Sequence, residues 1–109
     1  MRAGELNRKV NILQNIPVQD GYGSPVENWT IEFSTWAKIK PLRGRQYFVA
    51  QQANSEVTTE ITLRYNDSIT DNKRIQCGDV VFEILYVAHE DFAKKFLICM
   101  CKEATTIGH

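Results

Sequence analysis

The strongest constraint in this sequence is an alternation of apolar and polar residues between positions 29 and 40. The even positions are mostly Thr, Glu, Ser or Lys, whereas apolar side chains occupy these odd positions: Trp29, Ile31, Phe33, Ala37 and Ile39. A period of two matches a β-strand, whose successive side chains point to opposite faces, and it does not match a helix. The segment is therefore predicted to be a long strand with one face toward a core, ended by Pro41.

Further segments carry a strand signal, at residues 9–16, 57–65, 73–77, 80–88 and 94–103. In the first of them, one face is expected to hold Val10, Ile12, Gln14 and Ile16. The segment 80–88 is apolar on both faces except at Glu83, which predicts a central strand or one covered on both sides. Turn residues at 20–25 and at 78–79 predict hairpins.

About six short strands with hairpin spacing in 109 residues favour a mainly β fold, a small closed antiparallel barrel. We expect a single domain over residues 1–109. Within it we expect an N-terminal arm (1–8), a long loop or short helix inserted between strands two and three (42–56), a turn at 89–93 and a flexible tail (104–109).

Charge and hydropathy narrow the class of function. Lys plus Arg and Asp plus Glu each number 13, giving a formal net charge of zero, whereas free-standing nucleic-acid binders are usually basic. No apolar run approaches the roughly 20 residues of a membrane helix, and the N-terminus lacks the apolar core of a signal peptide. We expect a protein made in the cytosol, with no membrane partner.

Residues with reactive chemistry are present but are not arranged as a site. Cys77, Cys99 and Cys101 are expected to be free thiols packed as apolar residues, since they lack metal-ligand and redox spacing. His89 is expected in a solvated turn, and His109 is the last residue. The acidic candidates fall in predicted loops, where turn preference explains them: Asp67, Asp71, Asp79, Glu90 and Asp91. We therefore expect no cofactor, no metal and no enzyme.

The inserted segment is the best candidate for binding. Its aromatic and basic residues are Arg43, Arg45, Tyr47 and Phe48, with Lys38 and Arg64 possible neighbours. Basic residues beside aromatics suit a sequence-independent nucleic-acid barrel. The alternative is that these aromatics pack on their own barrel or on a neighbouring subunit. Trp36, an aromatic on the polar face of its strand, also indicates a contact surface.

The whole chain resembles a known family. The resemblance rests on "AGELNRKVNIL", "DGYGSPVENWT", "TWAKIKPLRGRQYFVAQQANSEVTTEITLRY" and "VVFEILYV", in this order, and runs from about Ala3 to Glu103. These segments are similar to the phage head–tail joining family of head-completion, or stopper, proteins. The resemblance implies a virion protein that is made in the host cytoplasm. It also implies a ring, twelvefold in the family, below the portal or adaptor, which closes the DNA exit channel and docks a tail protein.

The resemblance also implies roles for particular residues. A channel-facing loop that meets double-stranded DNA without sequence specificity would comprise Arg43, Gly44, Arg45, Gln46, Tyr47, Phe48, Gln51 and Gln52, with Gly44 as a pivot. Contacts between subunits would involve Trp36, Val81, Leu85 and Val87. The nucleic-acid barrel and a tail-completion subunit stay open as alternatives.

Overall fold

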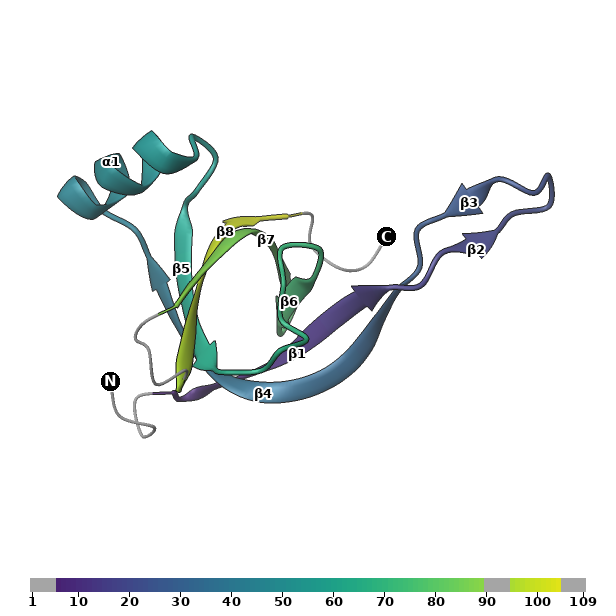
Figure 1. The fold of residues 1–109 in the computed structure, drawn as a ribbon, viewed down its shortest axis with the longest axis horizontal. Coiled ribbons are helices and arrows are strands. Elements are labelled where there is room, and N and C mark those ends of the chain that lie inside the picture. The colour runs from purple at the N-terminus through teal and green to yellow at the C-terminus, as the bar shows by residue number, and fades with distance from the viewer. Residues whose placement is uncertain (1–5, 90–94, 105–109) are drawn as a thin grey trace.

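Six strands close into a barrel. The structure, a computed structural model, describes residues 6–89 and 95–104. All strand pairs are antiparallel, in the order β1-β4-β5-β8-β7-β6, and β6 returns to β1 (Figure 1). The barrel strands are β1 (Arg8–Asn15), β4 (Trp29–Pro41), β5 (Thr59–Arg64), β6 (Arg74–Cys77), β7 (Val80–His89) and β8 (Phe96–Glu103). The predicted mainly β fold with a small antiparallel barrel is confirmed.

Two elements project from the barrel at opposite ends of its longest axis (Figure 1). One is a hairpin of β2 (Val18–Gln19) and β3 (Pro25–Val26), and the other is the helix α1 (Gly44–Ala53). The molecule measures 47 × 27 × 25 Å. The hairpin turn is held by the Asp20 carboxylate, which accepts hydrogen bonds from the backbone N–H groups of Tyr22 and Ser24 at 2.7 and 3.0 Å. The predicted hairpin and the predicted helix are both present.

The barrel interior is filled by one side of each strand, as the alternation predicted. Its buried members are Val10, Ile12, Ala37, Ile61, Leu63, Ile69, Ile75, Phe82, Ile84, Leu97, Cys99 and Cys101. Ile69 comes from the loop between β5 and β6 rather than from a strand, and it is only 5% exposed. Its role in the core was not visible in the strand pattern, because a lone isoleucine in a polar loop has no period.

A second apolar cluster, which we call the helix cluster, lies outside the barrel, beneath α1. Its buried members are Leu42, Ala50, Val57 and Met100, and the half-buried Tyr47, Leu85, Tyr86 and Ile98 pack against it. The strand at 80–88 was predicted to be covered on both faces, and other parts of the same subunit cover both. Phe82 and Ile84 of β7 face the barrel interior, whereas Leu85 and Tyr86 face the helix cluster.

Three expected core positions are wrong. Trp29 lies beyond the same irregularity as Ile31 and belongs to neither apolar cluster. Ile31 is 57% exposed because the register of β4 shifts there: Ile12 pairs with Phe33 but Leu13 pairs with Ile31, so Glu32 is an extra residue. Such a bulge reverses the alternation beyond it. Ile16 is 50% exposed because β1 ends at Asn15, and Ile16 lies at the base of the projecting hairpin.

Candidate functional site

The inserted segment leaves the barrel at the end of β4. Pro41 ends the strand, and Leu42 is buried in the helix cluster. Arg43 is the extended N-cap residue, with no side-chain capping bond, and Gly44 begins the helix with a φ of 56°. This left-handed conformation suits glycine, which has no Cβ to clash. The first turn of α1 carries no acidic residue, so Arg43 and Arg45 leave this end of the helix positively charged.

Hydrogen bonds close the insertion, and the Thr58 N–H at its end donates to the Cys101 carbonyl of β8 at 2.9 Å. The Leu42 N–H donates to the Thr58 carbonyl at 3.0 Å, which joins the two ends of the insertion. At the far end of the helix, the Asn54 N–H donates to Ala50 O at 3.1 Å. The Gln51 amide donates to the Val57 carbonyl. These bonds and the apolar cluster give α1 a defined position on the barrel.

The predicted channel-facing residues divide into two groups. The exposed group is Arg43, Gly44, Arg45, Gln46, Phe48 and Gln52. Tyr47 and Gln51 are half-buried: Tyr47 packs on the helix cluster, and Gln51 bonds Val57. The Tyr47 and Phe48 rings meet edge to face, with centroids 6.0 Å apart and planes at 77°. The aromatic pair thus has one ring anchored and one, Phe48, that is 70% exposed.

The four predicted interface residues lie in different surroundings. Trp36, on the outer face of β4, is 52% exposed. Val81 is only 5% exposed, Leu85 belongs to the helix cluster, and Val87 packs against the barrel core. Of these four, Trp36 therefore offers the most surface to a neighbour.

A groove runs between α1 and the barrel. It has a volume of about 430 Å³ and is lined by Leu42, Arg45, Gln46, Val49, Ala50, Ala53, Glu60, Tyr86 and Met100. Val49, which is 60% exposed, and Ala53 stand one helical turn apart on the groove side. Sequence reasoning missed the groove, since it joins residues of α1 to residues of β5, β7 and β8. The spacing of Val49 and Ala53 was the one signal for it.

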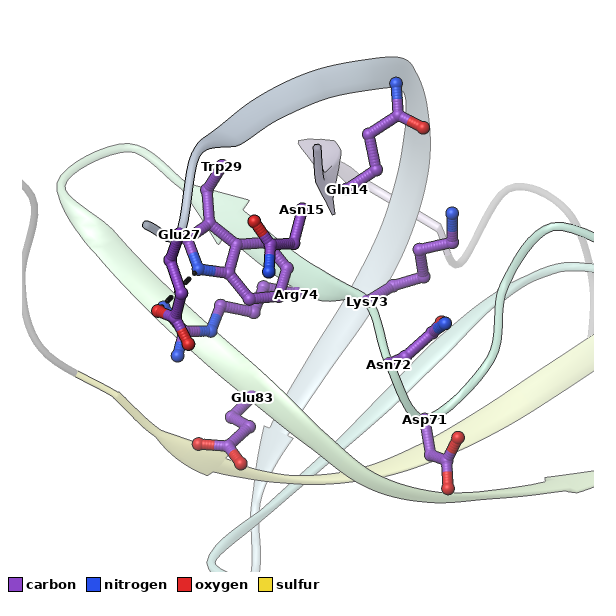
Figure 2. A pocket seen from close by; sticks show the side chains of 9 residues that line it. All are labelled: Gln14, Asn15, Glu27, Trp29, Asp71, Asn72, Lys73, Arg74 and Glu83. Carbon is purple, nitrogen blue, oxygen red and sulfur yellow. Dashed lines mark hydrogen bonds between the residues drawn. The ribbon is translucent and has the colours of Figure 1, made fainter. Parts of the chain in front are cut away.

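A second, more polar cleft of about 450 Å³ lies at the base of the hairpin (Figure 2). Its lining residues are Gln14, Asn15, Glu27, Trp29, Asp71, Asn72, Lys73, Arg74 and Glu83. The Arg74 guanidinium carbon lies 4.2 Å from the centroid of the Trp29 ring, and the Trp29 indole N–H donates to Glu27 at 3.2 Å. Lys73 is paired with Glu32 at 3.0 Å. Both charge signs line the cleft, so it does not form a uniformly positive phosphate site.

Two of the three cysteines, Cys99 and Cys101, lie in the barrel core. Cys77 is half-buried and Cys99 and Cys101 are buried, all as free thiols. Burial raises the pKa of Cys99 from its ordinary 9.0 to about 12, and burial also raises the pKa of Cys101. Because the thiolate is the form that attacks or ligates, neither buried thiol suits catalysis at neutral pH.

Other polar residues do not form a chemical site. Within residues 6–89 and 95–104, no three His, Cys, Asp or Glu side chains are placed to hold a metal, and no helix is long and apolar enough to cross a membrane. Hydrogen bonding to the Asp67 carboxylate raises the pKa of Tyr65. Asp71 and Asp79 are exposed. The side chain of His89 and the predicted candidates Glu90, Asp91 and His109 lie outside the described residues.

Comparison with known proteins identifies the class. A family model described as phage head completion protein matches residues 1–104. A search of curated proteins found no match. Protein SF1141 from Shigella flexneri 2a, solved in solution, shares the fold with a TM-score of 0.74 and 22% identity, covering 96% of this chain and 98% of that one.

A second solved structure also shares the fold. It is a chain from the virion of a native gene transfer agent particle, with a TM-score of 0.62 and 23% identity, covering 91% of this chain and 96% of that one. The family match spans nearly the whole sequence, so the chain belongs to the phage head completion family. It is a structural protein of the phage particle, and the family resemblance expected from the sequence is confirmed.

Proposed function

We propose that this chain is the head-completion, or stopper, subunit of a tailed phage or prophage. Copies would form a ring, twelvefold as in the family it resembles, below the portal or adaptor protein. The ring would close the DNA exit channel and offer a docking surface to a tail or tail-completion protein. Assembly would take place in the cytoplasm of the bacterial host.

The observation that carries the proposal is the single helical insertion of an otherwise closed barrel. A closed barrel has no free sheet edges and is a stable body for a ring. The insertion is fastened by the Leu42–Thr58 hydrogen bond and projects from one end of the molecule (Figure 1). A narrow channel can be closed by such elements from several subunits without rearranging their barrels.

The residues of the insertion suggest how it would act at the channel. Arg45, Phe48 and Gln52 are spaced i, i+3 and i+7, so they share one exposed helix face. Phe48 side chains from neighbouring subunits could pack together and close the opening, while Gln52 forms hydrogen bonds across it. Gln46 lines the groove between α1 and the barrel, so it is not assigned to the channel. Arg43 and Arg45 would meet DNA phosphates, a contact that carries no sequence information. Gly44 would be the pivot of the insertion.

Two other predicted residues are assigned a different part in this proposal. Tyr47 packs on the helix cluster and Gln51 bonds the Val57 carbonyl. We assign them to anchoring the insertion rather than to the channel. At the ring contacts, Trp36 is the most exposed of the four expected interface residues, and it would be covered by a neighbour.

The proposal is tested by deleting the gene from the phage or prophage that carries it and viewing the lysate by negative-stain electron microscopy. We expect free tails beside heads that have lost or leak DNA. Intact tailed particles would contradict the proposal and favour the nucleic-acid barrel. Full, stable heads without tails would assign the chain to a later joining or tail-completion step.

A further inference from the structure

Two exposed apolar surfaces lie at opposite ends of the molecule. The first, which we call the hairpin patch, comprises Ile16, Val18 and Val26, which are 50%, 48% and 44% exposed. Val18 and Val26 are direct cross-strand partners, and the Ile16 N–H bonds the Asn28 carbonyl at 2.9 Å, which continues the same register. Alternation along the strands places all three side chains on one face of the hairpin.

The second surface is the groove between α1 and the barrel described above. Its apolar wall is formed by Leu42, Val49, Ala53 and Met100. Val49 is 60% exposed, so the subunit's own side chains leave part of the groove open to a partner. Phe48 lies next to Val49 in the helix and points to the other flank, because successive residues are about 100° apart around the axis. A partner in the groove would therefore leave Phe48 free.

The two ends also carry opposite charge. Between Val10 and Ala37 the chain contains three acidic residues and no lysine or arginine; the acids are Asp20, Glu27 and Glu32. Between Phe33 and Ser55 it contains four basic residues and no acid; these are Lys38, Lys40, Arg43 and Arg45. The projecting hairpin segment, residues 16–28, thus carries two acids and no base, and the helical segment, residues 42–55, carries two bases and no acid. Lys73 and Arg74 lie in the cleft at the base of the hairpin, and Glu60 also lines the groove.

We infer that the hairpin of one copy docks into the helix groove of the next copy, with the hairpin patch against Val49 and Ala53. A hairpin cannot reach the groove of its own subunit, because the two lie at opposite ends of a molecule 47 Å long (Figure 1). Two different surfaces that match each other make a head-to-tail contact, which is the type that closes into rings. Opposite charges at the two surfaces favour this orientation and disfavour hairpin against hairpin.

The inference rests on the proposed ring and specifies its contact. It accounts for three apolar hairpin residues, Ile16, Val18 and Val26, that stay 44% to 50% exposed in the subunit. It also gives Arg43 and Arg45 a second possible partner, the acidic hairpin of a neighbouring copy. The helix face bearing Phe48 and Gln52 stays available for the channel.

Cross-linking in assembled particles tests the contact. The gene is altered to carry Cys77→Ser with Val18→Cys and Ala53→Cys, and purified particles are treated with a short bis-maleimide. The matched control carries Gln19→Cys, on the opposite face of the hairpin strand, and Gln52→Cys, about 100° around the helix from Ala53 and outside the groove lining. We expect a ladder of multimers of this chain from the first variant, at least roughly fivefold above the control, because neither control position faces the contact.

A charge reversal at the groove gives an independent readout. In the cross-linking background, Arg45→Glu should lower the yield of multimers roughly fivefold, as expected for a loss near the upper end for an exposed ion pair. Arg64→Glu, an exposed arginine at the other end of β5, should leave the yield unchanged. Equal losses in the two variants would count against the charge argument.

The outcomes separate this inference from the proposed function. Two outcomes in particles that contain the chain would overturn the docking inference and leave the head-completion role intact. One is equal cross-linking at the test and control positions. The other is cross-linking only between two hairpins, seen in trials with Val18→Cys alone. Normal particles that lack the chain altogether would overturn the head-completion role and, with it, the inference.

Discussion

Gly44 is the residue whose backbone most clearly limits substitution at the start of the insertion. Its φ of 56° is left-handed, and an added Cβ would have nothing within 4 Å, so the cost of replacing it comes from the backbone alone. Gly44→Ala should lower the free energy of unfolding by about 1 kcal/mol, measured by urea denaturation. Gly44→Asn should cost less, since asparagine tolerates this conformation better.

Gly21 supplies the control for this prediction. It also has nothing within 4 Å of an added Cβ, but its φ does not fall in the left-handed range. Gly21→Ala should therefore change the unfolding free energy little. Equal effects at Gly21 and Gly44 would show that the helix start does not depend on the left-handed conformation.

The cysteines give a prediction of chemical reactivity. In the native protein at about pH 8, a thiol reagent should label Cys77 readily and leave Cys99 and Cys101 unlabelled, because thiolate character and access both decide reactivity. All three should react in denaturant. Labelling is counted by mass spectrometry of the intact chain. Rapid native labelling of Cys99 or Cys101 would contradict their burial in the barrel core.

The same two thiols predict how stability depends on pH. Their folded pKa values are raised, so the protonated thiols contribute stability that is fully present below the ordinary thiol pKa of 9.0. As pH rises above 9.0 toward the value of about 12 for Cys99, the unfolded chain loses thiol protons first and stability falls. The measurement is the urea midpoint against pH, compared with Cys99→Ala/Cys101→Ala. An equal alkaline decline in both proteins would remove the thiols as its cause.

Single residues show where a sequence pattern is informative and where it is not. Alternation along β8 groups Leu97, Cys99 and Cys101 on one face, and the structure directs that face into the barrel because β8 is regular along these positions. It failed at Ile31, where a bulge at Glu32 reverses the faces. The sequence contains no local signal for a bulge of this kind, since the pairing with β1 creates it.

Among the elements, α1 depends most on contacts made by its partner strands. Met100 of β8 is 8% exposed in the helix cluster, so Met100→Ala should lower the free energy of unfolding by about 2 kcal/mol or more. Val49→Ala removes a side chain that lines the groove but is 60% exposed, so it should change this free energy by less than about 0.5 kcal/mol. Urea denaturation of both variants measures the difference.

The comparison of Met100→Ala with Val49→Ala tests whether the helix cluster holds the insertion. If Met100→Ala were as mild as Val49→Ala, the cluster under α1 would not be what holds the insertion. The helical circular dichroism of the two variants distinguishes local loss of α1 from loss of the barrel. We expect the α1 signal to weaken in Met100→Ala at urea concentrations where the barrel strands persist.

Element types were largely predictable, whereas contacts between elements were not. Turn residues marked both hairpins, and the break at Pro41 marked where the insertion begins. The helix groove and the cleft at Trp29 and Arg74 could not be predicted, because each brings together segments distant in sequence. For the same reason, the anchoring role of Gln51, which depends on the position of the Val57 carbonyl, was not visible.

At the level of the whole molecule, the important property is that its two ends carry different surfaces. A barrel with an acidic hairpin that carries an apolar face at one end and a basic helix at the other has two unlike surfaces, which suits a directional assembly (Figure 1). Family membership over residues 1–104 places the chain in the phage particle. The ring, its position under the portal and the channel-facing insertion are the parts of the account that an assembled particle must test.

A cryo-electron microscopy map of the head–tail connector, from the phage or prophage that carries this gene, is the most direct measurement. The account predicts a ring of this chain below the portal or adaptor, with the α1 insertions lining the channel and Phe48 near the axis. A map in which the chain is absent from the connector, or in which α1 lies on the outer rim of the ring, would contradict it.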